Sequence, residues 1–134
     1  MLSACRRREW SMGTFLSPHP PRAAGYAGRM ADHVQVVTTT DSEQAAAELA
    51  RGVVEARLGA CVQVVPIRSF YVWEGAAQDD AEWQLQIKTS AGRLPELVEH
   101  LRANHGYDVP EIIATPIVGG NPAYLAWVDD QTRP

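Results

Sequence analysis

Cys61 and Lys88 carry side chains that could do chemistry, because a thiol can act as a nucleophile or metal ligand and an ammonium group can hold an anion. Cys61 lies among small and apolar residues in a predicted strand, which favours a small buried side chain, with a reactive thiol as the alternative. Lys88 lies on the opposite face of a predicted strand from its apolar neighbours. It could meet Glu111, Glu74 or an anionic ligand there, or else solvent.

Recognisable enzyme motifs are missing from the sequence. It contains no Gly-rich phosphate loop, no nucleophile elbow and no HExxH metal motif. Asp79-Asp80 is too short for a calcium-binding loop, which needs a longer run of spaced carboxylates, so we expect a solvated loop tip there. We therefore expect that the protein is not an enzyme.

The chain has 134 residues, 46% of them apolar and 21% charged, which is typical of one globular domain. Its net charge of −4 is unevenly distributed: residues 1–29 carry five arginines and one glutamate, whereas residues 30–134 carry seven basic and 15 acidic side chains. So acidic a domain should repel nucleic acid and anionic lipid. No apolar run approaches the roughly 20 residues that span a bilayer. We expect no nucleic-acid partner and no membrane association.

Residues 1–29 differ from the rest of the chain: they have no hydrophobic periodicity, three consecutive arginines and several prolines and glycines. They predict an unstructured N-terminal extension or a misassigned start, followed by one domain over residues 30–134. The Arg-rich, acid-poor composition is also that of organelle transit peptides, which is the alternative. With Cys61 as its one cysteine, the domain suits a reducing compartment, and we expect a cytoplasmic protein.

The domain alternates between strand and helix patterns. Runs of β-branched or alternating apolar residues predict strands, and polar caps followed by apolar residues at i, i+3 and i+4 predict helices. In chain order we predict a strand at 34–38, a helix from about 43 to 58, strands at 61–65 and 69–73, a polar turn at 74–80, a strand at 82–89, a helix from about 90 to 104, a strand at 111–115 and a short helix after 121. The apolar run at 111–115 suggests burial on both faces.

Joining the strands at 61–65 and 69–73 into one long strand, bent at Pro66, gives the order β-α-β-β-α-β followed by a C-terminal helix. This is the ferredoxin-like α+β arrangement, in which helices cover one face of an antiparallel sheet and leave the other open.

Four large side chains near the end of that long strand alternate between the two faces of the sheet. Phe70 and Val72 point one way, and Tyr71 and Trp73 point the other way. One helical layer can cover only one of these pairs. The other pair then has to meet another subunit or a ligand, and oligomerisation is the simpler explanation.

Five short strings occur in a characteristic order along the domain. They are AC at 60–61, YVWEG at 71–75, IKT at 87–89, HGYDVPEI at 105–112 and GNPAYLAW at 120–127. Together they resemble the CutA family of divalent-cation tolerance proteins, over residues 34 to about 128. The resemblance implies a ferredoxin-like fold, a homotrimer built through the long hairpin, a link to copper and other divalent ions, and kinship with the trimeric PII signalling proteins.

The resemblance also implies candidate site residues. Copper-binding members have a cysteine at the end of the first strand and a His-His pair before the last strand. Here Thr38 and Asn104 replace two of these ligands, so that His105 remains as the candidate metal ligand. The alternative for His105 is a helix C-terminal residue that interacts with the helix dipole. We also expect a cleft between subunits, for a ligand or for interface packing, whose residues are Cys61, Tyr71, Trp73, Lys88, Tyr107 and Glu111.

Two functions are compatible with this resemblance. The first is a homotrimer for divalent-cation tolerance or homeostasis, with copper or another divalent metal as its ion. The second is a PII-like trimeric signalling or scaffold protein that binds a small molecule or a protein partner in clefts between its subunits.

Overall fold

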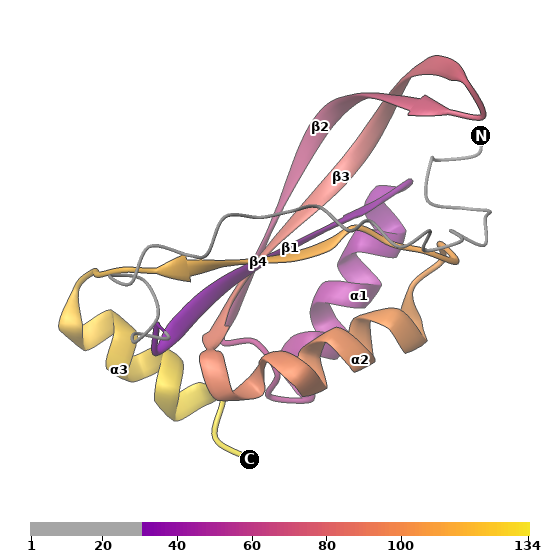
Figure 1. Ribbon diagram of the computed structural model, residues 1–134. Helices are drawn as coiled ribbons and strands as arrows, with labels where there is room; N and C mark the ends of the chain where they lie inside the picture. The colour runs from indigo at the N-terminus through magenta and orange to yellow at the C-terminus, as the bar shows by residue number, and fades with distance from the viewer. Residues whose placement is uncertain (1–30) are drawn as a thin grey trace, which may run out of the picture.

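Residues 31–134 are described by a computed structural model, shown in Figure 1. Its elements are β1 (His33–Thr40), α1 (Glu43–Glu55), β2 (Cys61–Trp73), β3 (Ala76–Ser90), the 3-10 helix η1 (Ala91–Arg93), α2 (Leu94–Asn104), β4 (Ile112–Ile117) and α3 (Pro122–Gln131). The strands form one antiparallel sheet in the order β2-β3-β1-β4. The predicted ferredoxin-like α+β order with an additional C-terminal helix is confirmed. The extension predicted for residues 1–29 lies outside the described residues.

Two of the helices, α1 and α3, begin at a residue whose side chain caps the first turn. The Ser42 hydroxyl accepts a hydrogen bond from the backbone N–H of Ala45 at 3.1 Å and so satisfies a free donor of the first turn of α1. The Asn121 side chain caps α3 in a similar way. After α1, the chain passes so close to β3 that a Cβ on Gly59 would lie 2.7 Å from Cγ2 of Ile87. Glycine at this position therefore lets the chain return onto the sheet.

The hydrophobic core lies between one face of the sheet and the helices α1 and α2, which lie side by side in Figure 1. Its buried apolar residues are Val34, Val36, Ala46, Leu49, Val53, Leu58, Leu85, Ile87, Leu97 and Leu101. All but Leu58, which follows α1, come from these two helices and from the two central strands, as the predicted helical and alternating patterns require. We call the opposite face of the sheet the open face.

The strands β2 and β3 form one long hairpin. β2 continues through Pro66, whose missing N–H is tolerated because β2 lies at the edge of the sheet. The polar turn predicted over 74–80 is wrong in length. The turn consists of Glu74 and Gly75, with φ angles of 50° and 80°, as in a tight type I′ hairpin turn. Residues 76–80 instead extend β3 and pair with the end of β2.

A cross-strand contact explains why a polar segment continues as a strand. Arg68 on β2 donates two hydrogen bonds to the Asp79 carboxylate on β3, at 2.8 and 2.7 Å. The guanidinium group also lies over the Phe70 ring, 4.9 Å from its centroid. The expected solvated loop tip at Asp79-Asp80 is therefore part of a paired strand. The prediction was wrong because an exposed strand with polar residues on both faces cannot be distinguished from a loop by its residue types.

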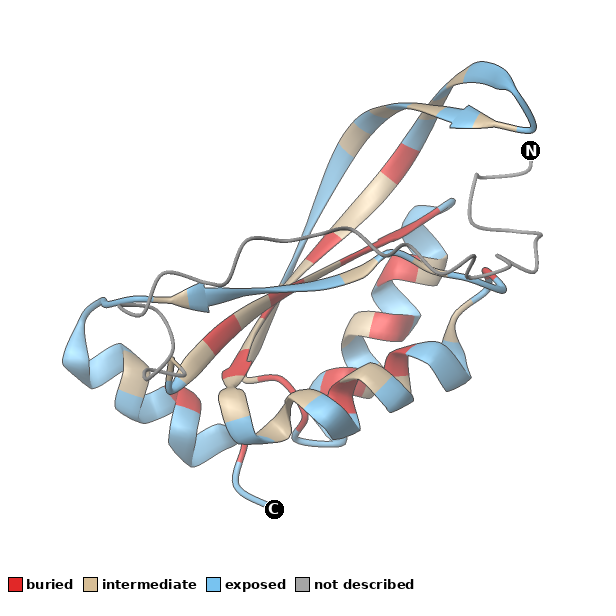
Figure 2. Cartoon of the chain, in the orientation of Figure 1, coloured by how far each residue is buried: buried red, intermediate tan, exposed pale blue. Residues whose placement is uncertain are grey.

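The outer part of this hairpin, residues 68–81, projects beyond the helices, and we call it the hairpin arm (Figures 1 and 2). On the arm, Phe70 is 68% exposed and Val72 is 73% exposed. Tyr71 and Trp73, on the other face of the strand, are half-buried. The expectation that the helical layer covers one of these two pairs is wrong, because the arm extends past the helices.

The last strand, β4, is also less buried than predicted. The run at 111–115 was expected to be buried on both faces, yet Ile113 is 52% exposed and most of its neighbours are exposed as well. The reason is that β4 is an edge strand that pairs only with β1. Its apolar residues therefore enlarge the uncovered apolar surface of the single chain.

Candidate functional site

His105 follows the last residue of α2 and lies against the end of β1. Its Nδ1 accepts a hydrogen bond from the backbone N–H of Tyr107 at 3.1 Å, so the proton of the neutral ring is on Nε2. Nε2 is 3.1 Å from the hydroxyl of Thr38 and donates to it. Burial lowers the pKa of His105. A hydrogen bond to the Thr39 backbone and the charge of Asp41 act in the opposite direction, but their effect is smaller. His105 is thus a neutral ring with both nitrogens in use.

This arrangement does not fit the metal site that the sequence resemblance implied. Thr38 is fully buried and offers only a hydroxyl, and the amide of Asn104 is directed to the backbone carbonyl of His100 at 2.8 Å. The lone pair with which His105 could bind a metal is occupied by the Tyr107 N–H. Within residues 31–134, no three His, Cys, Asp or Glu side chains gather as a ligand set. A transition metal prefers several imidazoles or thiolates, and these three positions provide one engaged imidazole.

The six predicted cleft residues lie in three separate places on the single chain. The first place contains Cys61 and Lys88, which are opposite each other on β2 and β3. Lys88 donates to the side-chain oxygen of Gln63. Cys61 is half-buried and lies next to the Tyr124 hydroxyl of α3. Burial of that hydroxyl is the main cause that raises the pKa of Tyr124, and its interaction with Cys61 raises it further. Cys61 is therefore in contact with α3, and it is less buried than predicted.

The ion pair considered for Lys88 does not form within the described chain, where the salt bridges involve other residues. Glu74 is at the hairpin turn, beyond the first residue of β3, Ala76, which itself lies twelve strand positions or roughly 40 Å from Lys88. Lys88 is bonded instead to a neutral amide on the same face of the hairpin.

The second place contains Tyr107 and Glu111, together with Glu82 of β3. The buried Tyr107 donates its hydroxyl proton to the carboxylate of Glu82 at 3.0 Å. The pKa of Glu111 is raised mainly because the carboxylate loses solvation, and to a smaller extent because the Glu82 carboxylate repels it. Two carboxylates therefore lie near each other at this end of the sheet. Sequence reasoning missed Glu82, although its spacing of two, four and six from Gln84, Gln86 and Lys88 places it on the same strand face.

The third place is the hairpin arm, with Tyr71 and Trp73. The Tyr71 hydroxyl donates to the Asp80 carboxylate across the two strands, and Trp73 is the last residue of β2 before the turn. The structure of one chain thus does not bring the six residues together. The arm would have to reach another subunit for them to form one cleft.

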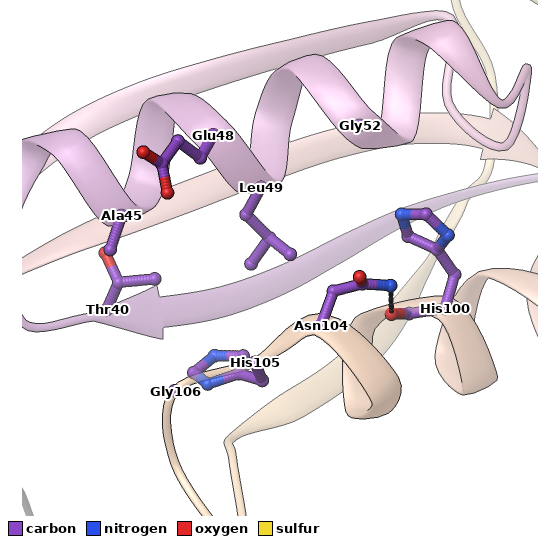
Figure 3. Close-up of a pocket in the computed structure, with 9 residues that line it drawn as sticks. All are labelled: Thr40, Ala45, Glu48, Leu49, Gly52, His100, Asn104, His105 and Gly106. Carbon is purple, nitrogen blue, oxygen red and sulfur yellow. Dashed lines mark hydrogen bonds between the residues drawn. The ribbon is translucent and has the colours of Figure 1, made fainter.

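A cavity of about 370 Å³ lies between α1 and α2 (Figure 3). Its lining residues are Thr40, Ala45, Glu48, Leu49, Gly52, His100, Asn104, His105 and Gly106. Sequence reasoning did not identify His100 or Glu48 as site residues. The signal that could have found them is helical spacing, since His100 and Asn104 are one turn apart on α2.

The fold and these sites define a class of protein: a small ferredoxin-like α+β domain with a projecting hairpin and an uncovered sheet face. A family model described as "CutA1 divalent ion tolerance protein" matches residues 34–131. The chain therefore belongs to the CutA1 family, as the sequence motifs predicted. Among the described residues, no helix is both long enough and apolar enough to cross a membrane.

Several relatives support this assignment. A CutA protein of Arabidopsis thaliana, named as chloroplastic, is 48% identical over 75% of this chain and 56% of its own length. The divalent-cation tolerance protein CutA of Thermus thermophilus is 44% identical over 72% of this chain and 95% of its own length. The chain thus spans little more than half of the plant relative but nearly all of the bacterial one.

Solved structures agree with the fold. The crystal structure of CutA1 from Oryza sativa has a TM-score of 0.75 at 47% identity and covers 77% of this chain and 95% of its own. The periplasmic divalent cation tolerance protein CutA from Archaeoglobus fulgidus has a TM-score of 0.74 at 33% identity, over 75% of this chain and 99% of its own.

Proposed function

We propose that this protein acts in divalent-cation tolerance as a homotrimer whose subunits join through the hairpin arm and the open face. The observation that carries this proposal is the arm itself, where Phe70 and Val72 are 68% and 73% exposed in the single chain. Each such side chain contributes roughly 1.5–3 kcal/mol when it is fully buried, so a few of them per subunit can hold an assembly. Membership of the CutA1 family supports the link to divalent cations.

Assembly would also give the predicted cleft residues a common location. The arm with Tyr71 and Trp73 lies at one end of the hairpin, and Cys61 with Lys88 lies at the other. Only a neighbouring subunit can bring an arm to such a distant place. In this proposal the cleft is a feature of the trimer, and the protein binds ions or ligands without catalysing a reaction.

A growth assay tests this function. The full chain, produced in a bacterial strain that lacks its own CutA protein, should restore growth at raised copper concentration. Val72→Asp places a charge in the proposed interface and should abolish the rescue. Val54→Asp is the matched control, because Val54 is 46% exposed on α1, away from the arm. Absence of rescue by the unaltered chain, or equal rescue by both variants, would refute the proposal.

A PII-like role is the second candidate function, and the Tyr107–Glu82 contact favours it. A buried hydroxyl bonded to a carboxylate, with Glu111 nearby, is a polar group of the kind that orients a small ligand in a cleft. In this case the trimer would bind a small molecule or a protein partner and relay its presence. Tyr107→Phe should then reduce ligand-induced thermal stabilisation while copper tolerance is unchanged.

The expected cytoplasmic location is part of the proposal. The plant relatives are named as chloroplast proteins, which makes an organelle the competing location. Fractionation of cells that express the full chain with a C-terminal tag distinguishes the two, since import into an organelle would place the protein in that fraction.

A further inference from the structure

The charge of Lys88 is not balanced by a carboxylate of the described chain. Lys88 is the only lysine among the 134 residues. Four of the described arginines form salt bridges with aspartate or glutamate, whereas Lys88 forms none and donates to the neutral side-chain oxygen of Gln63. Although residues 30–134 carry 15 acidic side chains, their one ammonium group thus has an uncharged partner. Such a group keeps its attraction for an anion.

The open face around Lys88 supplies further hydrogen-bond donors. Cys61 on β2 and Gln35 on β1 lie directly opposite Lys88, and Gln63 is its diagonal neighbour. The ammonium group has three N–H donors, one of which is used by Gln63. The NH₂ groups of Gln63 and Gln35 form no hydrogen bond with any described residue. Three side chains that can donate to one acceptor group therefore lie next to one another on this face.

The two carboxylates that occur on this side of the sheet already have partners. Asp129 of α3 accepts a hydrogen bond from the Ser90 hydroxyl at 2.9 Å and pairs with Nε2 of His33 at 2.9 Å. Glu82 accepts the Tyr107 hydroxyl proton and lies six strand positions, or roughly 20 Å, from Lys88 along β3. The anion that complements Lys88 therefore has to come from outside the described chain.

Helix α3 adds an aromatic surface beside these donors. The Tyr124 hydroxyl lies next to Cys61, which is directly opposite Lys88. The Tyr124 ring contacts the Trp127 ring, with 5.5 Å between the centroids, and the two residues are 40% and 42% exposed. A few polar groups beside apolar rings are typical of a site for a small organic molecule.

We propose that Lys88, Gln63 and Gln35 bind the carboxylate group of a small molecule whose apolar part lies against Tyr124. One ammonium group balances one negative charge, whereas the excess of acidic side chains in residues 30–134 repels a dianion such as phosphate. This site goes beyond the proposed function, because it is separate from the Tyr107–Glu82 contact and is complete within one chain. It depends neither on a metal ion nor on the trimer.

Protection of Lys88 from acetylation is the first test. Because Lys88 is the only lysine, acetylation of the full chain with N-hydroxysuccinimidyl acetate can be followed at this residue by peptide mass measurement. Sodium benzoate, as the probe, should slow the reaction at Lys88 several-fold and in a saturable manner. Benzamide has nearly the same shape without the charge and should have no effect, and phosphate should protect less than benzoate. The α-amino group of the chain is the internal control, whose acetylation rate should not change.

Calorimetric titration of variants with benzoate is the second test. Lys88→Met should abolish binding, and Lys88→Arg, which keeps the charge, should retain it. Gln63→Leu should weaken binding about tenfold, because a hydrogen bond to a charged group is lost. Gln44→Leu is the matched control, since the Gln44 amide is exposed on α1, and it should bind as the unaltered chain does. Circular dichroism verifies that each variant keeps the fold.

Three results would overturn the inference. The first is that benzoate does not protect Lys88, and the second is that benzamide protects it equally, which would exclude recognition of the charge. The third is that phosphate protects it better than benzoate, which would exclude a single carboxylate as the ligand class. If copper tolerance and the trimer persist in any of these cases, the proposed function stands and only this site is wrong.

Discussion

The helical side of the sheet and the hairpin arm differ in how much of their apolar surface the single chain buries. On the helical side, Leu85 and Ile87 are fully buried, and the chain supplies every element that covers them. On the hairpin arm, Phe70 and Val72 are among the most exposed large apolar residues described. The helical side therefore determines whether the chain folds, whereas the arm and the open face determine what it assembles with. Substitutions on the two sides should therefore have separable effects.

A cavity in the helical core should have the largest effect on folding. Leu97→Ala removes a fully buried side chain of α2 and should lower the free energy of unfolding by about 2–5 kcal/mol. Urea denaturation at equal protomer concentration measures the change. Phe70→Ala, on the arm, should leave the fold intact and weaken assembly instead. Equal losses of secondary structure in both variants at low denaturant would contradict the separation of the two sides.

Overpacking of the same side should have a smaller effect. Gly59→Ala places a methyl group 2.7 Å from Ile87 and 2.8 Å from Val53, and should destabilise the protein by about 1–3 kcal/mol. Gly92→Ala is the matched control, because nothing lies within 4 Å of its Cβ position. Thermal unfolding of both variants measures the difference, and similar melting temperatures would show that the contact at Gly59 relaxes freely.

One change should make the helical side more stable. The Thr89 hydroxyl is fully buried and has no hydrogen-bond partner among the described residues. Thr89→Val keeps the shape and removes this unsatisfied group, which should raise the free energy of unfolding by about 1 kcal/mol. Denaturant titration should show a higher midpoint with the same slope. A lower midpoint would mean that the hydroxyl has a partner in the assembled protein.

The smallest expected effect is a pH dependence at His105. Because burial lowers its pKa in the folded state, the neutral ring stabilises the fold fully above about pH 6.5, the unfolded value. This stability is lost as the pH falls through the lower folded value, when protonation breaks the bond from Tyr107 to Nδ1. His105→Gln should reduce the stability difference between pH 7.5 and pH 5.5 by less than about 1 kcal/mol, since the ring is partly exposed. An unchanged difference would show that other groups control it.

Periodicity predicted the helical side well and the arm poorly, for a physical reason. The apolar spacing on α1 and α2 is imposed by the core that the helices cover, so both helices were predicted from the sequence alone. The turn at 74–80 was predicted too long because Asp79 is polar for contact with Arg68 across the strands, a pairing that local sequence does not specify. Burial of β4 was overestimated because a sequence does not reveal which strand is at an edge.

The candidate site shows the same limit. The sequence motifs identified Tyr107 and His105, but the role of each depends on a partner distant in sequence: Glu82 for the first and Thr38 for the second. Glu48 and His100 are likewise 52 positions apart in the sequence, and both line one cavity only because α1 packs against α2.

The mass of the intact protein in solution tests the central claim most directly. Sedimentation of the full chain, whose subunit mass is 14.7 kDa, should give three times that value. Val72→Asp should sediment as a folded single chain, and Val54→Asp should remain a trimer. A single-chain mass for the unaltered protein, or a trimer that survives Val72→Asp, would contradict the claim that the hairpin arm is completed by other subunits.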